Sequence, residues 1–290
     1  MRMMGRWLGG IVAVAMLAVV GRAAADPASL GQQPVQVEAP VPPAPPQEDR
    51  HQLNQLFQFE ATPDVCAAGE AYVSGQGNYF DDFPGAGGLD PFGYSLKGQE
   101  VRLQVQGQYG ITDQIAVGGY LPFIDNLKSG ASTGLGDIGL YAQYKLDRVI
   151  DPQVVDVTAQ LDVLVPSGDY NGFRDNGQVG VRPLALAYKD FGRHGPGVAG
   201  AYGLLGFTAA GRCDLRIGLA GTYEFGPVTG VLELFGVHGF GSARRSGFFT
   251  PGVVYRGVDS FEFALGVPLG ISNMSPDWGV TFKVTYAFQR

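Results

Sequence analysis

From about residue 68 to the end of the chain, apolar and polar side chains alternate with a period of two. Strands have this period because successive side chains point to opposite faces, whereas a helix repeats every 3.6 residues. The pattern is clearest in residues 100–109, where Val101, Leu103 and Val105 share one face and glutamine and arginine residues share the other. The sequence therefore predicts an all-β chain built from many half-buried strands.

Alternation alone does not distinguish a soluble sandwich from a membrane barrel, since strands of both have one polar and one apolar face. Strand length does, because the alternating stretches run for about nine to twelve residues, which is what a tilted strand needs to cross a bilayer. The predicted fold is a transmembrane antiparallel up-and-down β-barrel of about twelve strands. Ten strands are also compatible with the sequence, because Pro183 interrupts the sixth strand and Glu233 stands among apolar residues in the ninth. The predicted strands are 68–80, 98–109, 114–123, 135–146, 153–165, 178–189, 197–208, 213–225, 228–239, 248–256, 259–271 and 278–288.

Six of the 13 tyrosines recur every 31 to 44 residues, each near the end of an alternate predicted strand. Alternate strands of an up-and-down barrel run in the same direction, so these rings would lie at one membrane interface, where amphipathic rings are most stable. Connections after these strands are short and predict periplasmic turns, whereas the opposite connections are often longer and predict outward loops. The predicted aromatic girdle is Tyr109, Tyr144, Tyr188, Tyr223, Tyr255 and Tyr286.

Two segments precede the predicted barrel of residues 66–290. Residues 1–25 carry Arg2 and Arg6 before an apolar run that ends in three alanines, which predicts a secretory signal peptide. Residues 26–65 are proline-rich and predict a periplasmic tail or linker, which is either disordered or includes a short helix. An exported barrel would be located in the outer membrane of a Gram-negative-type cell, with the outer-membrane lipid and the outer-membrane assembly machinery as its partners.

Charge and cysteine content exclude several classes of function. Loss of the signal peptide would take the formal net charge from −7 to −10, and an acidic surface argues against nucleic acid as a partner. Cys66 and Cys213 are expected to be free thiols, because they lie at opposite ends of the predicted barrel. Neither has a histidine at ligand spacing, so no metal site and no cofactor are predicted.

The polar faces of the predicted strands supply the candidate site, a passage or small-solute site. Their four positive and five negative charges nearly cancel. This balance fits either a constriction that binds a solute or a set of buried ion pairs that satisfies the interior. The lumen-lining candidates are Arg102, Gln104, Gln106, Gln108, Asp137, Gln143, Lys145, Asp156, Gln160, Asp162, Arg216, Glu224, Glu262 and Lys283.

No catalytic residue is predicted. His238 with Ser242 is the sole histidine and serine pair near the predicted outer rim, and no third residue is in place to orient the histidine. A channel or transporter for a small-molecule solute is therefore favoured. The alternatives are a structural or occluded barrel without transport and, ranked below it, a barrel lipid hydrolase.

Three motifs resemble those of a known family, the outer-membrane β-barrels of the MetA-pathway of phenol degradation family. They are Gly-Leu-Gly-Asp-Ile-Gly-Leu-Tyr-Ala-Gln-Tyr at 134–144, Val-Pro-Ser-Gly-Asp at 165–169 and Ile-Thr-Asp-Gln-Ile-Ala-Val-Gly-Gly-Tyr-Leu-Pro at 111–122. The resemblance covers roughly residues 66–290. It implies passage of small, often hydrophobic or aromatic, compounds across the outer membrane, and it implies no catalytic residue. The chain departs from a general habit of outer-membrane barrels, because it ends in Arg290 and its last aromatic residue is Phe288.

Overall fold

The computed structural model describes one β-sheet and the connections next to its strands. The described residues are 65–81, 99–127, 133–147, 149–167, 179–194, 197–208, 213–240, 245–272 and 274–288. The predicted signal peptide, the predicted tail up to residue 64 and the central parts of most predicted outward loops lie outside the described residues. Within the described ranges, no helix is long and apolar enough to cross a membrane.

Fourteen strand segments make up the sheet. They are β1 (Ala71–Asp81), β2 (Glu100–Thr112), β3 (Ile115–Asn126), β4 (Gly134–Leu135), β5 (Ile138–Lys145), β6 (Asp156–Val165), β7 (Gly180–His194), β8 (Gly197–Thr208), β9 (Asp214–Phe225), β10 (Val228–Gly239), β11 (Arg245–Val258), β12 (Phe261–Gly266), β13 (Leu269–Gly270) and β14 (Trp278–Phe288). Residues 136–137 interrupt one strand between β4 and β5, and residues 267–268 interrupt another between β12 and β13. The fourteen segments therefore form twelve strands.

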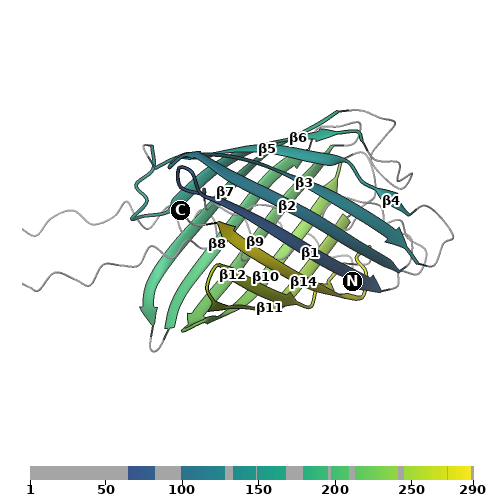
Figure 1. Ribbon diagram of the computed structural model, residues 1–290. Helices are drawn as coiled ribbons and strands as arrows, with labels where there is room; N and C mark the ends of the chain where they lie inside the picture. Colours follow the sequence, from purple (N-terminus) through teal and green to yellow (C-terminus); the bar gives the residue numbers. More distant parts are fainter. Residues whose placement is uncertain are drawn as a thin grey trace, which may run out of the picture. The chain divides into compact units, whose positions relative to one another are not determined.

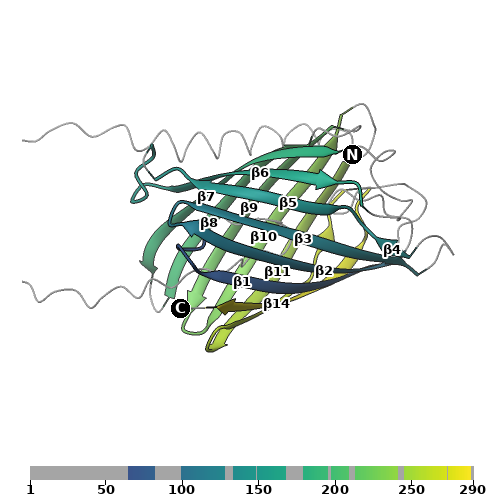
Figure 2. The same cartoon turned by 45° about the horizontal axis from the view of Figure 1, so that its top comes forward.

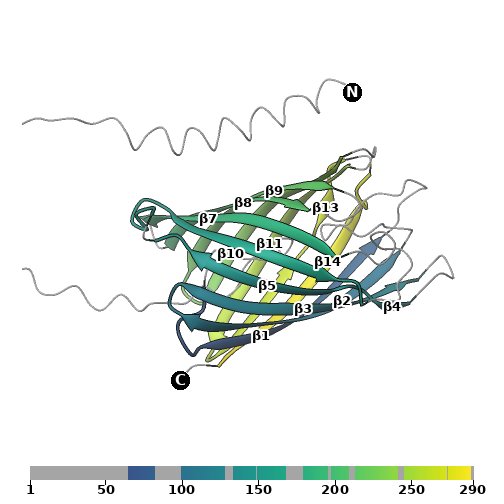
Figure 3. The same ribbon diagram turned by 90° about the horizontal axis from the view of Figure 1, so that it is seen from above.

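Each strand pairs antiparallel with its neighbour in the sequence, and the sheet closes on itself. Closure joins β1 to β14 along their whole length, from Ala71 opposite Phe288 to Asp81 opposite Trp278. The strands run obliquely side by side (Figures 1 and 2), and Figure 3 shows β1 to β3 and β7 to β9 on opposite sides of the barrel. The predicted fold, an antiparallel up-and-down barrel of twelve strands, is confirmed.

The two strands that the sequence left in doubt are both present. In β7, Pro183 is opposite Leu161 of β6, while pairing with β8 starts one residue later, at Leu184 opposite Gly206. The proline, which lacks an N–H, therefore stands where only one neighbouring ladder is formed. In β10, alternating burial is regular and Glu233 is on the buried face.

At the end of the barrel where short connections were predicted, two-residue turns join β2 to β3, β9 to β10 and β11 to β12, whereas residues 146–155 join β5 to β6. Asp113 and Gln114 join β2 to β3, and Gly226 and Pro227 join β9 to β10. Gly226 has a φ of 57°, a conformation that costs glycine little and that a tight hairpin requires. The connection after predicted strand 178–189 is shorter than expected, because β7 continues through an irregularity in its pairing and ends at His194.

Burial in this barrel is the reverse of that in a soluble protein. The outer face exposes large apolar side chains on every side, such as those of Leu103, Val105, Leu140 and Leu232, while arginines, glutamines and aspartates are buried on the inner face. Soluble proteins place such polar groups outside and most large apolar groups inside. A surface of this kind is stable in hydrocarbon, which is the arrangement of a transmembrane barrel.

Candidate functional site

Strand β2 contributes the longest polar row of the interior. Arg102, Gln104, Gln106 and Gln108 are all buried and share one face, because they are two residues apart. Arg102 donates from its terminal nitrogen Nη2 to Gln104 Oε1 at 3.0 Å, so the row is linked along the strand.

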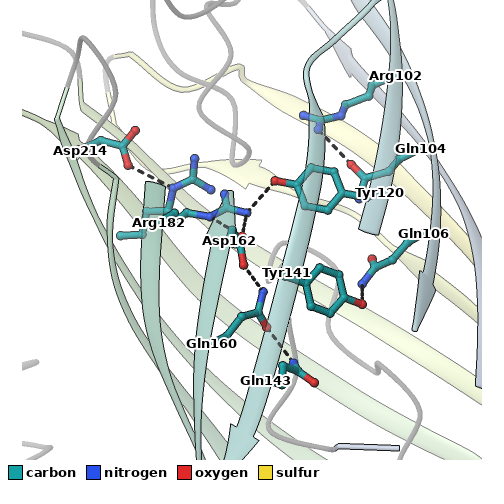
Figure 4. Close-up of polar contacts among 11 residues, drawn as sticks. Arg102, Gln104, Gln106, Tyr120, Tyr141, Gln143, Gln160, Asp162, Arg182 and Asp214 are labelled. Atoms are coloured by element: carbon teal, nitrogen blue, oxygen red, sulfur yellow. Dashed lines mark hydrogen bonds and ion pairs between the residues drawn. The ribbon is translucent and has the colours of Figure 1, made fainter. Parts of the chain in front are cut away.

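A charged network with amide branches crosses from β5 to β7 (Figure 4). Arg182 on β7 forms an ion pair with Asp162 on β6, with Nε donating to Oδ2 at 2.8 Å, and both side chains are almost completely buried. Gln160 Nε2 donates to Asp162 Oδ1 at 2.5 Å, and Gln143 Nε2 donates to Gln160 Oε1 at 2.7 Å. The carboxylate therefore accepts hydrogen bonds at both oxygens, as a charge buried in the interior requires.

Tyr120 on β3 extends this network past two intervening strands. Arg182 donates from Nη2 to the Tyr120 hydroxyl at 3.0 Å, and its guanidinium lies 6.0 Å from the centre of the Tyr120 ring. The ring reaches so far because it lies over Gly139, its cross-strand partner on β5, where a Cβ atom would overlap it.

The neighbouring pair repeats this arrangement in the opposite direction. Tyr141 on β5 lies over Gly118, its partner on β3, and its hydroxyl donates to Gln108 Oε1 at 3.2 Å. Gln106 Nε2 in turn donates to the Tyr141 hydroxyl, also at 3.2 Å. The glycines thus give two tyrosines the space to lie flat on the inner wall and to link β2, β3, β5 and β7.

A second chain of charges runs across β9, β11, β12 and β14. Arg256 donates from Nε to Glu262 Oε2 at 2.9 Å, and its terminal nitrogen Nη1 is 3.8 Å from Glu224 Oε2. Lys283, which is buried on β14, interacts electrostatically with Glu262 and with Glu233 of β10. Positive and negative groups alternate along this chain, so its net charge is small.

Apolar side chains predominate on the other side of the interior, where they lie beside buried charged and hydroxyl side chains. The apolar side chains come from β7 to β12 and make one buried cluster, in which Tyr188 and Tyr202 have ring centres 4.5 Å apart. The buried asparagine and glutamine side chains of the described residues all lie on β1, β2, β5 and β6. The interior therefore has an amide-rich wall and an apolar wall. The apolar cluster is Leu184, Leu186, Tyr188, Tyr202, Leu204, Ala220, Val231, Phe235, Val237, Phe248, Val254 and Ala264.

The predicted lumen residues divide into a buried and a half-buried group. Ten have buried side chains on the inner face: Arg102, Gln104, Gln106, Gln108, Gln143, Gln160, Asp162, Arg216, Glu262 and Lys283. The other four, Asp137, Lys145, Asp156 and Glu224, are half-buried and lie near strand ends. Lys145 and Asp156 form an ion pair of 3.4 Å there, and buried Arg216 donates to Asp214 at 3.2 Å.

Five of the six predicted girdle tyrosines are on the outer face at the end with the short turns. Tyr109, Tyr144, Tyr223 and Tyr255 are exposed, and Tyr286 is half-buried between aromatic neighbours. Tyr188 was assigned wrongly, because its side chain is buried in the apolar cluster. The error has a physical cause, since alternation from outward-facing Pro183 turns residue 188 inward, and β7 continues well beyond it.

Several interior residues were missed from the sequence. Arg182 lies beside Pro183 in predicted strand 178–189, Asp214 stands next to the start of predicted strand 213–225, and Arg256 ends predicted strand 248–256. All three take part in ion pairs. Period-two alternation, continued through Pro183, would have placed Arg182 on the inner face. No comparable signal identifies the contact of Tyr120 with Arg182, because the space that the Tyr120 ring occupies depends on register with Gly139.

The described residues include neither a cluster of metal ligands nor a serine placed beside a histidine base. No group of three or more histidine, cysteine, aspartate or glutamate side chains in the described ranges could hold a metal ion. The His238 ring contacts Phe240 edge-on, with centres 5.6 Å apart, and Ser242 lies outside the described residues. Cys66 and Cys213 form no disulfide with each other, as the sequence predicted.

Comparison with known proteins identifies the fold. No protein-family model matches the chain, and no curated protein matches its sequence. An outer-membrane channel from Pseudomonas putida F1 is similar in structure, with a TM-score of 0.52 and 16% identity over 77% of this chain and 97% of that one. The KdgM porin has a TM-score of 0.50 and 10% identity over 75% of this chain and 99% of the porin. At such low identity the likeness concerns the fold, and membership in the MetA-pathway of phenol degradation family stays a prediction. The chain has the closed-barrel fold of outer-membrane channels and porins.

Proposed function

We propose that this protein is an outer-membrane channel for small solutes with an apolar or aromatic body and a polar substituent. The observation that carries the proposal is the division of the interior into an amide-rich wall and an apolar wall. A solute between them would satisfy its polar group on glutamines and bury its body against leucine, valine and aromatic side chains.

The balance of charges on the inner face supports a preference for uncharged solutes. The buried inner face pairs Arg182 with Asp162, Arg216 with Asp214, and Arg256 with Glu262. A wall whose charges neutralise each other has no strong field to attract ions of either sign. Rings of a single sign, which would favour cations or anions, are not present among the described residues.

The outer surface supports a location in the outer membrane, with the barrel in contact with lipid. Exposed aromatic residues occur at both ends of β14, with Phe288 near the short turns and Trp278 at the opposite end. Ten residues separate them, which is about 33 Å along a strand. At a tilt of about 40° this gives about 25 Å across the membrane, the height of the apolar band of outer-membrane barrels.

Reconstitution tests the proposal. Protein purified from the outer membrane of an expressing Gram-negative host should make liposomes permeable to a small neutral aromatic solute that crosses lipid slowly, such as phenyl glucoside. Val231→Thr keeps the side-chain shape but adds a polar group to the apolar wall. It should slow the entry of the aromatic solute into liposomes relative to the entry of a small sugar. Val253→Thr, the matched change on the exposed face, should not. Wild-type liposomes no more permeable than empty ones would refute a channel.

An occluded barrel without transport is the second candidate, and one observation favours it. The side chains of Arg102, Arg182, Phe80, Phe248 and Lys283 are all less than 2% exposed, so the interior is closely packed. Planar-bilayer recording separates the candidates. A channel gives stepwise conductance in the wild type, whereas a filled barrel gives none.

A further inference from the structure

Five side chains form a continuous polar row on the inner face, near the end of the barrel that has the short turns. Glu224 is directly opposite Thr229, and Glu262 is directly opposite Thr285. Arg256 connects the two pairs, because it donates to Glu262 at 2.9 Å and approaches Glu224 at 3.8 Å. We call these five residues the turn-end row.

Four atoms of the turn-end row have hydrogen-bonding capacity that the described residues do not use. They are Thr229 Oγ1, Arg256 Nη2, Glu262 Oε1 and Thr285 Oγ1, each buried and without a hydrogen-bond partner among the described residues. Leaving one buried polar atom unsatisfied costs about 1–3 kcal/mol. Four unsatisfied polar atoms on adjacent strands indicate a binding place in the interior for a polar group that does not belong to the barrel itself.

The chemistry of these atoms defines the group that fits. Arg256 offers N–H donors, Glu262 offers an acceptor, and each threonine hydroxyl can do either. A hydroxyl group, which donates once and accepts twice, matches this set, whereas a purely acceptor or purely donor group does not. The charges of Glu224 and Glu262 are balanced by those of Arg256 and Lys283, so a neutral group is favoured over an ion.

Apolar residues adjoin the turn-end row on the same face. Val254 is directly opposite Thr229, Ala264 follows Glu262 by two residues, and both belong to the buried apolar cluster. We propose that the turn-end row is a binding subsite for the hydroxyl group of a neutral amphiphilic solute, whose apolar body lies against Val254 and Ala264. This inference names the substrate class of the interior and so rests on the proposed function.

Equilibrium dialysis with the barrel in lipid nanodiscs tests the subsite separately from transport. The probes are benzyl alcohol and toluene, which differ by one hydroxyl group, and empty nanodiscs correct for partition into lipid. Wild-type protein should bind benzyl alcohol in preference to toluene. Thr229→Val together with Thr285→Val should reduce that preference by about three- to tenfold, the effect of losing one hydrogen bond or two.

Thr250→Val is the matched control. Thr250 is also completely buried and its hydroxyl also lacks a partner among the described residues, but it is opposite Glu233, away from Arg256. It should leave the preference unchanged. No preference in the wild type, an unchanged preference in the double variant, or an equal loss in the control would each overturn the subsite. If liposomes stay impermeable but the preference for benzyl alcohol falls in the threonine double variant, the channel is refuted and the subsite is supported.

Discussion

Removing one partner of the buried pair between Arg182 and Asp162 should destabilise the barrel strongly. Both side chains are at most 1% exposed, so Arg182→Met would leave the Asp162 carboxylate buried, with Gln160 as its remaining hydrogen-bond donor among the described residues. Breaking such a pair costs about 3–5 kcal/mol, because an uncompensated charge stays in a poorly solvated place. Asp162→Leu should cost about as much for the same reason.

The double variant, Arg182→Met with Asp162→Leu, distinguishes the pair from its surroundings. Without either charge, the remaining losses are the hydrogen bonds with Gln160 and the Tyr120 hydroxyl, about 0.5–1.5 kcal/mol each. The double variant should therefore cost no more than either single variant, giving an interaction energy of about 3 kcal/mol or more.

Urea titration of the barrel folded in lipid vesicles measures these free energies, with the fraction folded read from the faster migration of unheated samples on gels. The slope of the free energy of unfolding against urea concentration should be the same for the four proteins, so that differences in the unfolding midpoint report differences in stability. Single variants that each lose less than about 1 kcal/mol, or a double variant that loses the sum of both within about 0.5 kcal/mol, would refute a coupled buried pair.

Three further predictions concern packing and orientation. Gly139→Ala should lower the urea midpoint and raise conductance, because a Cβ would displace the Tyr120 ring, whereas Gly75→Ala, with nothing within 4 Å of the added atom, should change neither. Tyr188→Ala should cost about 3–5 kcal/mol by emptying part of the apolar cluster, and Tyr144→Ala on the exposed face should cost less; equal losses would contradict the inward position of Tyr188. In intact cells a membrane-impermeant maleimide should label Cys213, at the long-loop end, and should reach Cys66 only after the outer membrane is permeabilised; the reverse order would invert the proposed orientation.

The fold could be predicted from the sequence because alternation is a local signal. Strand β2 is readable from its own residues, since polar and apolar side chains alternate without interruption. Even β10 follows the rule, with Glu233 inward and Leu232 and Leu234 outward. The sequence pattern of β10 looks irregular because its inner face belongs to the apolar wall, so both faces of the strand carry large apolar residues.

The strand interruptions and the networks could not be predicted in this way. The breaks at 136–137 and 267–268 leave the hydrophobic pattern nearly intact, so alternation does not mark them, although Pro268, which lacks an N–H, lies in the second. The contact of Arg182 with Tyr120 depends on the register of four strands, and a single sequence indicates register only through its hydrophobic pattern and its turns. Ion pairs between strands are therefore the part of the site that a sequence predicts least well.

Two cross-strand pairs of a tyrosine and a glycine on β3 and β5 determine both the strand register and the geometry of the candidate site. Tyr120 over Gly139 and Tyr141 over Gly118 fit only in one register, because a slip of one residue would turn both tyrosines toward lipid. The same register sets the Tyr120 hydroxyl against Arg182 and the Tyr141 hydroxyl against Gln108. A change at either glycine therefore alters the polar wall without altering any charge. By contrast, Gln106→Leu would remove a polar group and leave both ring positions in place. Comparing the two kinds of variant separates the contribution of wall shape from that of wall polarity to any solute preference of the barrel.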